Sequence, residues 1–175
     1  PAFGSGETVN SGVYYIGGAG SLAGTITLDG ENNPDAIFVF KFNGAFSVAA
    51  QSKVILTNGA IPCNVFWIAE GAASMGVFTY MKGTVLAHVG ACTMAANGNL
   101  QGRMLSTTGA IGFSTGVIYN DPLCFLDDTS DQDNDGFTNA EELAGIGGFI
   151  GDPYDYNSPF THQETTGSGT NEDQV

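Results

Sequence analysis

Residues 71–119 repeat themselves at a fixed period, and this repeat limits the fold more than any other feature of the chain. Gly71 opens GAASMGVFTYMKGTVLAHV, Gly90 opens GACTMAANGNLQGRMLSTT, and Gly109 opens GAIGFSTGVIY. The first two units are each 19 residues long, and Met75 and Met94 hold the same offset in them. A period near 20 with short apolar runs and glycine turns is typical of a solenoid. Strands of about 5 residues plus turns fill that length, which favours three short strands per coil.

The sequence before the repeat also favours strands. Helix formers are scarce in the first 120 residues, and glycine, at 26 of 175 residues, would weaken a helix. The run Leu22–Leu28 alternates as a half-buried strand does. The runs 36–42 and 64–69 are nearly all apolar and predict strands buried on both faces, with Trp67 in the core. The predicted fold class is therefore all-β, a β-solenoid with a C-terminal extension.

Charge divides the chain into two regions. Residues 1–120 hold five acidic and four basic side chains, whereas residues 121–175 hold thirteen acids and no lysine or arginine. Carboxylates at that density repel one another unless cations lie among them. A chain with a net charge of −14 has no basic stripe, which argues against nucleic acid as a partner. We expect four segments: a linker or N-terminal segment over 1–12, the solenoid over 13–120, an acidic calcium-binding extension over 121–160 and a flexible tail over 161–175.

The segment 131–142, DQDNDGFTNAEE, has the pattern of a calcium loop. A loop of this kind places oxygen ligands at its positions 1, 3, 5, 7, 9 and 12, with glycine at position 6 for the sharp turn. The matching residues are Asp131, Asp133, Asp135, Phe137 through its carbonyl, Asn139 and Glu142, with Gly136 at the turn. The sequence therefore predicts a Ca²⁺ site, and the alternative is a solvated acidic loop.

The flanks of this loop are not those of a full EF-hand. No amphipathic helix precedes it, and glycine follows Leu143 and Ala144 at once. The motif therefore resembles a single calcium loop of the thrombospondin type 3 or dockerin-like kind. A second cation site nearby is a weaker possibility, with Asp152, Asp155 and Asn157 as its ligands.

The remaining reactive side chains do not indicate an enzyme. His88 and His162 have no partner at catalytic spacing, and no nucleophile motif is present. The three cysteines lack metal-site spacing. We expect one disulfide between Cys63 and Cys124, the alternative being three small buried thiols. No run of 18 apolar residues that could span a membrane occurs.

Residues 8–120 resemble the ice-binding-protein-like family of secreted microbial proteins. The resemblance lies in NVFWIAEGAASMG, MKGTVLA and LQGRMLSTTGAI, and upstream in DAIFVFKF and GVYYIGGAGSLAGTITLDG. It implies a right-handed β-solenoid, triangular in section, with a long helix packed along one side. It also implies that in some members one flat face with rows of small polar residues, often threonine, binds ice, while other members are adhesins or surface modules.

Two features depart from the family. Its usual N-terminal part, with the first coils and the long helix, is absent from this sequence. No regular Thr-x-Thr ladder appears either, although Ser74, Thr93 and Ser114 are candidates for an ice or partner face. The first hypothesis is therefore an extracellular structural or adhesive module, ordered by calcium and self-assembling into fibres through open solenoid ends. The second hypothesis is an ice-binding protein that uses one flat face, and glycan binding through exposed aromatics is a third.

Overall fold

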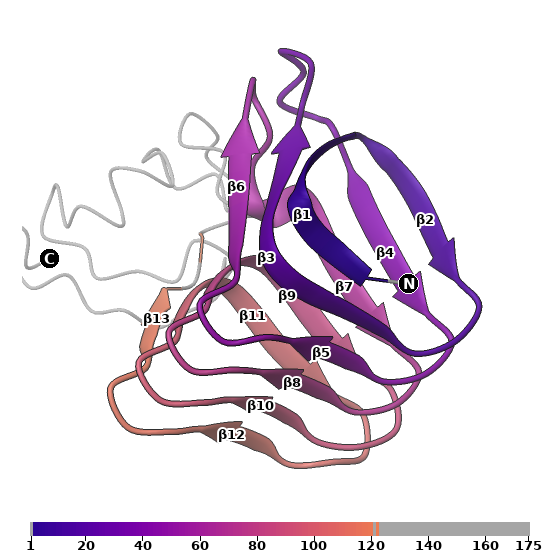
Figure 1. Cartoon of the computed structure of the whole chain (residues 1–175). Helices are drawn as coiled ribbons and strands as arrows, with labels where there is room; N and C mark the ends of the chain where they lie inside the picture. Colours follow the sequence, from indigo (N-terminus) through magenta and orange to yellow (C-terminus); the bar gives the residue numbers. More distant parts are fainter. Residues whose placement is uncertain (1, 121, 123–175) are drawn as a thin grey trace, which may run out of the picture. The chain divides into compact units, whose positions relative to one another are not determined.

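The computed structural model describes residues 2–120 and 122, and these residues form a β-solenoid (Figure 1). Thirteen strands belong to one sheet, and every strand pair in it is parallel. Parallel strands need crossover connections, and here the crossovers are the other sides of each coil. The predicted all-β solenoid is therefore confirmed.

The strands stack on three faces, each named here by the side chains it turns outward. The bulky face consists of β2 (Gly12–Ile16), β4 (Phe38–Phe42), β7 (Val65–Ala69) and the later parts of β9 (Tyr80–Ala87) and β11 (Asn99–Ser106). The mixed face consists of the later part of β3 (Gly20–Asp29), β6 (Lys53–Thr57), the first parts of β9 and β11, and β13 (Ile118–Asn120). The small-residue face consists of the first part of β3, β5 (Phe46–Val48), β8 (Ala73–Met75), β10 (Cys92–Met94) and β12 (Ile111–Phe113).

The core lies inside the coils and is built around Trp67, which is fully buried as predicted. Its ring stacks on Phe40 at 4.3 Å and on Phe46 at 5.4 Å between centroids. Its indole Nε1 donates a hydrogen bond of 2.9 Å to the carbonyl of Lys82, which satisfies the one polar group of the side chain. The aromatic stack thus ties two turns of the solenoid together.

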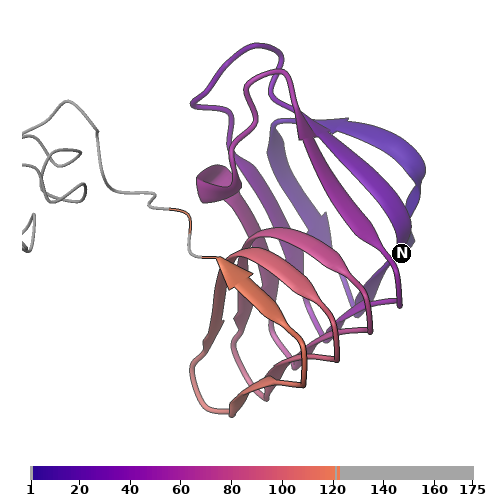
Figure 2. The ribbon, with the colours of Figure 1, turned by 90° about the vertical axis from the view of Figure 1, so that its left-hand side faces the viewer.

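The coils are of two lengths. Adjacent residues of the outward row on the small-residue face, starting at Ser21, lie 26, 27, 19 and 19 residues apart. In the long coils, residues 30–37 and 58–64 form loops at the corner between the mixed and bulky faces, the second including a 3₁₀ turn, η1 (Pro62–Asn64); both loops project in Figure 2. In the short coils β9 and β11 cross that corner without interruption.

A glycine makes the tight corner in each short coil. Gly83 has φ +96°, and a Cβ at this position would lie 2.4 Å from the carbonyl oxygen of Val65. Gly102 stacks on Gly83 in register. The left-handed backbone and the lack of space explain why glycine recurs at this offset of the sequence repeat.

Two details differ from the sequence-based expectations. The segment expected as a linker, 1–12, contains strand β1 (Ala2–Asn10), which pairs with β3 and turns Phe3 against the edge of Phe40, 5.5 Å between centroids. The runs 36–42 and 64–69 are not buried on both faces. Only their alternate residues point inward, and Val39, Lys41, Phe66 and Ile68 lie on the bulky face. Sequence pattern missed this because the outward side chains are themselves mostly large and apolar.

Residues 123–175 lie outside the described part of the chain, so the acidic extension and the tail stay predictions. Among the described residues, no helix is long and apolar enough to cross a membrane.

Candidate functional site: the small-residue face

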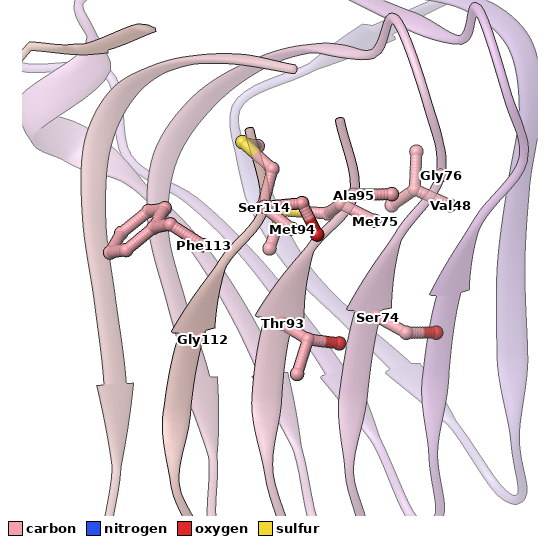
Figure 3. Close-up of a pocket in the computed structure, with 10 residues that line it drawn as sticks. All are labelled: Val48, Ser74, Met75, Gly76, Thr93, Met94, Ala95, Gly112, Phe113 and Ser114. Carbon is pink, nitrogen blue, oxygen red and sulfur yellow. The ribbon is translucent and has the colours of Figure 1, made fainter. Parts of the chain in front are cut away.

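Ser74 and Thr93, two of the residues predicted for a partner face, lie side by side on neighbouring strands (Figure 3). Gly112 lies next to Thr93 in the same row. Ser114, the third predicted residue, lies in the adjacent row, since its backbone N–H donates to the carbonyl of Met94. The three predicted side chains therefore share one face but do not form one line.

The whole small-residue face consists of three such rows. The central row runs in register through Ser21, Ser47, Ser74, Thr93 and Gly112. Alanine occupies every position of one flanking row: Ala19, Ala45, Ala72, Ala91 and Ala110. The other flanking row holds Ala23, Ala49, Gly76, Ala95 and Ser114.

Alternation along each strand produces these rows. In β8 and β10 the central residue is exposed, and the residues on either side of it are buried. Met75 and Met94 therefore point inward, although both are large enough to disrupt a flat surface. Adjacent strands in a sheet lie about 4.8 Å apart, and alternate residues along a strand lie about 6.6 Å apart. The rows thus form a two-dimensional grid of small side chains.

The face is shallow and uncharged. None of the fifteen row positions carries a charged residue, and no side chain is larger than threonine. The surface dips in a shallow hollow of about 420 Å³ over β8, β10 and β12, lined in part by Ser74, Gly76 and Ala95. The bulky face, in contrast, turns Val13 and Tyr15 outward at 75% and 66% exposure. The rows of the small-residue face therefore carry smaller outward side chains than the bulky face does.

Sequence reasoning missed most of these positions. It proposed only Ser74, Thr93 and Ser114 for the face, so Ser21 and Ser47 in the long coils were not included. A signal for them exists, because each strand of the face follows the same pair, Gly-Ala, at 18–19, 44–45, 71–72, 90–91 and 109–110. Small residues two and four positions after each alanine mark the face in all five coils.

Only some residues of the other predicted sites lie in the described part of the chain. Cys92 is free and buried, and Cys63 carries a disulfide bond. Its predicted partner Cys124 lies outside the described residues, so that pairing stays a prediction. The same holds for every ligand of the two proposed calcium sites, from Asp131 to Asn157. Residues 2–120 themselves contain no group of three metal-ligating side chains.

Comparison with known proteins gives one family. The family model described as ice-binding-like matches residues 3–119. An ice-binding protein of a Nostoc species is 34% identical over 116 residues, which are 66% of this chain and 42% of that protein. Ice-binding protein 1 of Shewanella frigidimarina is 30% identical over 113 residues, which are 63% of this chain and 13% of that protein. The chain thus spans less than half the length of these relatives.

Solved structures show the same similarity. An ice-binding protein from an Antarctic Flavobacteriaceae bacterium is 46% identical, with a TM-score of 0.70, over 73% of this chain and 30% of that one. The ice-binding protein of the Antarctic ascomycete Antarctomyces psychrotrophicus is 29% identical, with a TM-score of 0.65, over 69% of this chain and 58% of that one.

Proposed function

This chain belongs to the ice-binding-like family, and we propose that it binds ice through its small-residue face. The observation that carries the proposal is the register of the rows: five coils present small side chains at matching positions, without a charge. Relatives named as ice-binding proteins support ice as the ligand, and the geometry of the rows supports the choice of face.

A flat, regular face suits a solid ligand for physical reasons. A crystal surface cannot adapt to a protruding side chain, so one large residue would hold the whole face away from it. Charged groups retain their own hydration shells, and the rows contain no charged group. Hydroxyl groups such as those of Ser74 and Thr93 can exchange hydrogen bonds with surface water, while alanine methyl groups lose unfavourable hydration on contact.

The expected main function, a structural or adhesive module that forms fibres, was wrong. The family match and the curated relatives are ice-binding proteins, which favours the alternative hypothesis. The error arose because the face was judged by threonine content. The structure shows regularity in size instead, with serine, threonine and glycine sharing one row. Ice in nature grows in the water around cells, so the proposal implies an extracellular location.

The test replaces Thr93 with tyrosine, which would protrude from the centre of the grid. We expect Thr93→Tyr to lose most of the thermal hysteresis and of the inhibition of ice recrystallisation, with little change in melting temperature. Thr84→Tyr is the matched control, because Thr84 occupies an outward position of β9 on the bulky face. Full activity in Thr93→Tyr, or equal loss in Thr84→Tyr, would assign ice binding to another surface.

The calcium loop over 131–142 remains a separate proposal, supported by its ligand pattern alone. We expect chelation to increase protease cleavage after Asp121 while leaving the activity of the small-residue face unchanged. Equal cleavage with and without calcium would contradict it.

A further inference from the structure

The mixed face carries a second hollow, whose lining residues differ in kind from those of the small-residue face. Its volume is about 360 Å³, and its lining includes Lys53, Ile55, Tyr80 and Lys82. Lys53 and Tyr80 are neighbours in register between β6 and β9. Ile55 and Lys82 lie two residues further along the same strands, so the four side chains occupy adjacent outward positions of one sheet surface.

An apolar floor and two ammonium groups define this hollow. Tyr80 and Ile55 are 49% and 45% exposed and offer an aromatic ring and an aliphatic surface. The Lys53 ammonium lies 5.3 Å from the centroid of the Tyr80 ring. The Lys82 ammonium donates a hydrogen bond to the side-chain oxygen of Gln101 on β11. The first contact holds the Lys53 ammonium over the ring, and the second holds the Lys82 ammonium against the neighbouring strand β11.

No carboxylate lines the hollow. Residues 2–120 hold only four lysine or arginine side chains, and two of them meet here. Lys41, on the bulky face, is in contrast paired with Glu70 at 3.3 Å. The remaining acids of the described chain are Glu7 in β1 and Asp29, Glu31 and Asp35, at the end of β3 and in the loop that follows. The hollow is therefore a local positive site on an otherwise acidic protein.

We infer that this hollow binds a carboxylate-bearing saccharide, such as a uronate unit of an oligosaccharide. A sugar ring presents an apolar C–H face that packs on tyrosine, and its hydroxyl groups need planar amide or hydroxyl partners. Gln101 and Asn99 on β11 and Thr27 on β3 lie in the adjacent positions of the same face. The carboxylate of the sugar accepts charge-assisted hydrogen bonds from Lys53 and Lys82.

Other ligand classes fit less well. A nucleic acid would bring many phosphates, and two lysines neutralise too few of them to hold it at physiological salt. A neutral sugar would leave the two ammonium groups without a counter-charge. The uronate unit packs on the ring and also supplies a counter-charge to the cations.

The experiment titrates the protein with a tetragalacturonate and with its methyl ester, which lacks the carboxylate charges, and follows binding by calorimetry. We expect the ester to bind at least about tenfold more weakly, a difference of about 1.4 kcal/mol. Lys53→Gln and Tyr80→Ala should each weaken tetragalacturonate binding by a similar factor, whereas Lys41→Gln, the control on the bulky face, should not. Thr93→Tyr should leave this binding intact, which separates the hollow from the ice-binding proposal.

Several results would overturn the inference. These are equal binding of acid and ester, equal loss in Lys41→Gln, no binding at millimolar saccharide, or tighter binding of a single-stranded oligonucleotide that depends on Lys53. Loss of binding in Tyr80→Ala, with Lys53→Gln unaffected, would also reject the assigned role of the charges.

Discussion

The long coils and the short coils of this solenoid solve the same packing problem with different side chains. The long coils enclose stacked rings, with Tyr14, Phe40 and Trp67 in one column. The short coils enclose Ala87, Cys92, Met94 and their neighbours instead. The long coils therefore bury larger side chains than the short coils, in which a single glycine forms the corner between the mixed and bulky faces.

The small-residue face runs through this change without a break. Ser47 belongs to a long coil and Ser74 begins a short one, yet they are direct neighbours in register. The additional residues of the long coils enter at the corner between the mixed and bulky faces. Insertions there alter the width of the coil but leave the grid on the third face regular, so the core and the proposed binding face can vary independently.

The largest expected effect is on the long coils. Trp67→Ala should destabilise the protein by about 4 kcal/mol, because it removes a buried aromatic side chain between Phe40 and Phe46. It also leaves the carbonyl of Lys82 without its hydrogen bond. Equilibrium denaturation in urea measures the change.

Phe66→Ala is the control, because Phe66 is the adjacent residue of β7 and lies outward, half-buried. We expect a loss of about 1 kcal/mol there, in line with partial burial of an apolar side chain. Equal losses in the two variants would show that the aromatic stack is not the element that stabilises the long coils.

Sequence alone predicted the fold well and the binding face only in part. The solenoid was found because the short coils have equal lengths and repeat Gly83 at Gly102. The long coils repeat nothing at that period, since their loops over 30–37 and 58–64 differ in length and composition. The Gly-Ala pairs mark Ser21 and Ser47 in the sequence, but strand register places them in line with Ser74. Register depends on contacts between coils that a single sequence does not display.

The sequence also did not predict which apolar residues point outward and which point inward. Phe66 and Trp67 are both large and aromatic, so the sequence gives no reason to separate them. The separation comes from the pleat, which places alternate residues on opposite sides of a strand. Where both sides carry apolar residues, as on the bulky face, composition predicts burial that the structure does not show.

A second prediction concerns how readily the short coils open. Burial raises the pKa of the Cys92 thiol from 9.0 to about 11. We expect an alkylating reagent to modify Cys92 at least about 100-fold more slowly in the folded protein than in urea, because the raised pKa lowers the thiolate fraction by that factor and burial also hinders access. Rapid labelling without unfolding would show that the short coils open more easily than their burial indicates.

The raised pKa of Cys92 also predicts how the stability of the protein depends on pH. Since the folded protein holds the proton of Cys92 more tightly, the stabilisation is present below pH 9 and is lost as the pH rises from 9 towards 11. Cys92→Ala is the control, because it retains every other group that titrates in this range. The two proteins should lose stability at different rates only above pH 9.

The smallest expected effect is at the corner between the small-residue and mixed faces, where each coil has a left-handed residue. In the short coils these residues are Phe78, Asn97 and Gly116, with φ between 56° and 72°. Asparagine and glycine adopt this backbone readily, whereas phenylalanine is strained in it. Because Phe78 is 48% exposed, Phe78→Asn should stabilise the protein by about 0.5–1 kcal/mol.

The reciprocal variant Asn97→Phe should destabilise the next coil by a similar amount. The melting temperatures of the two variants report both changes in stability. Opposite shifts of similar size would show that the two short coils obey one backbone rule at this corner. A loss of stability in Phe78→Asn would instead mean that the Phe78 ring contributes packing that offsets its backbone strain, and that the first short coil still depends on an aromatic side chain, as the long coils do.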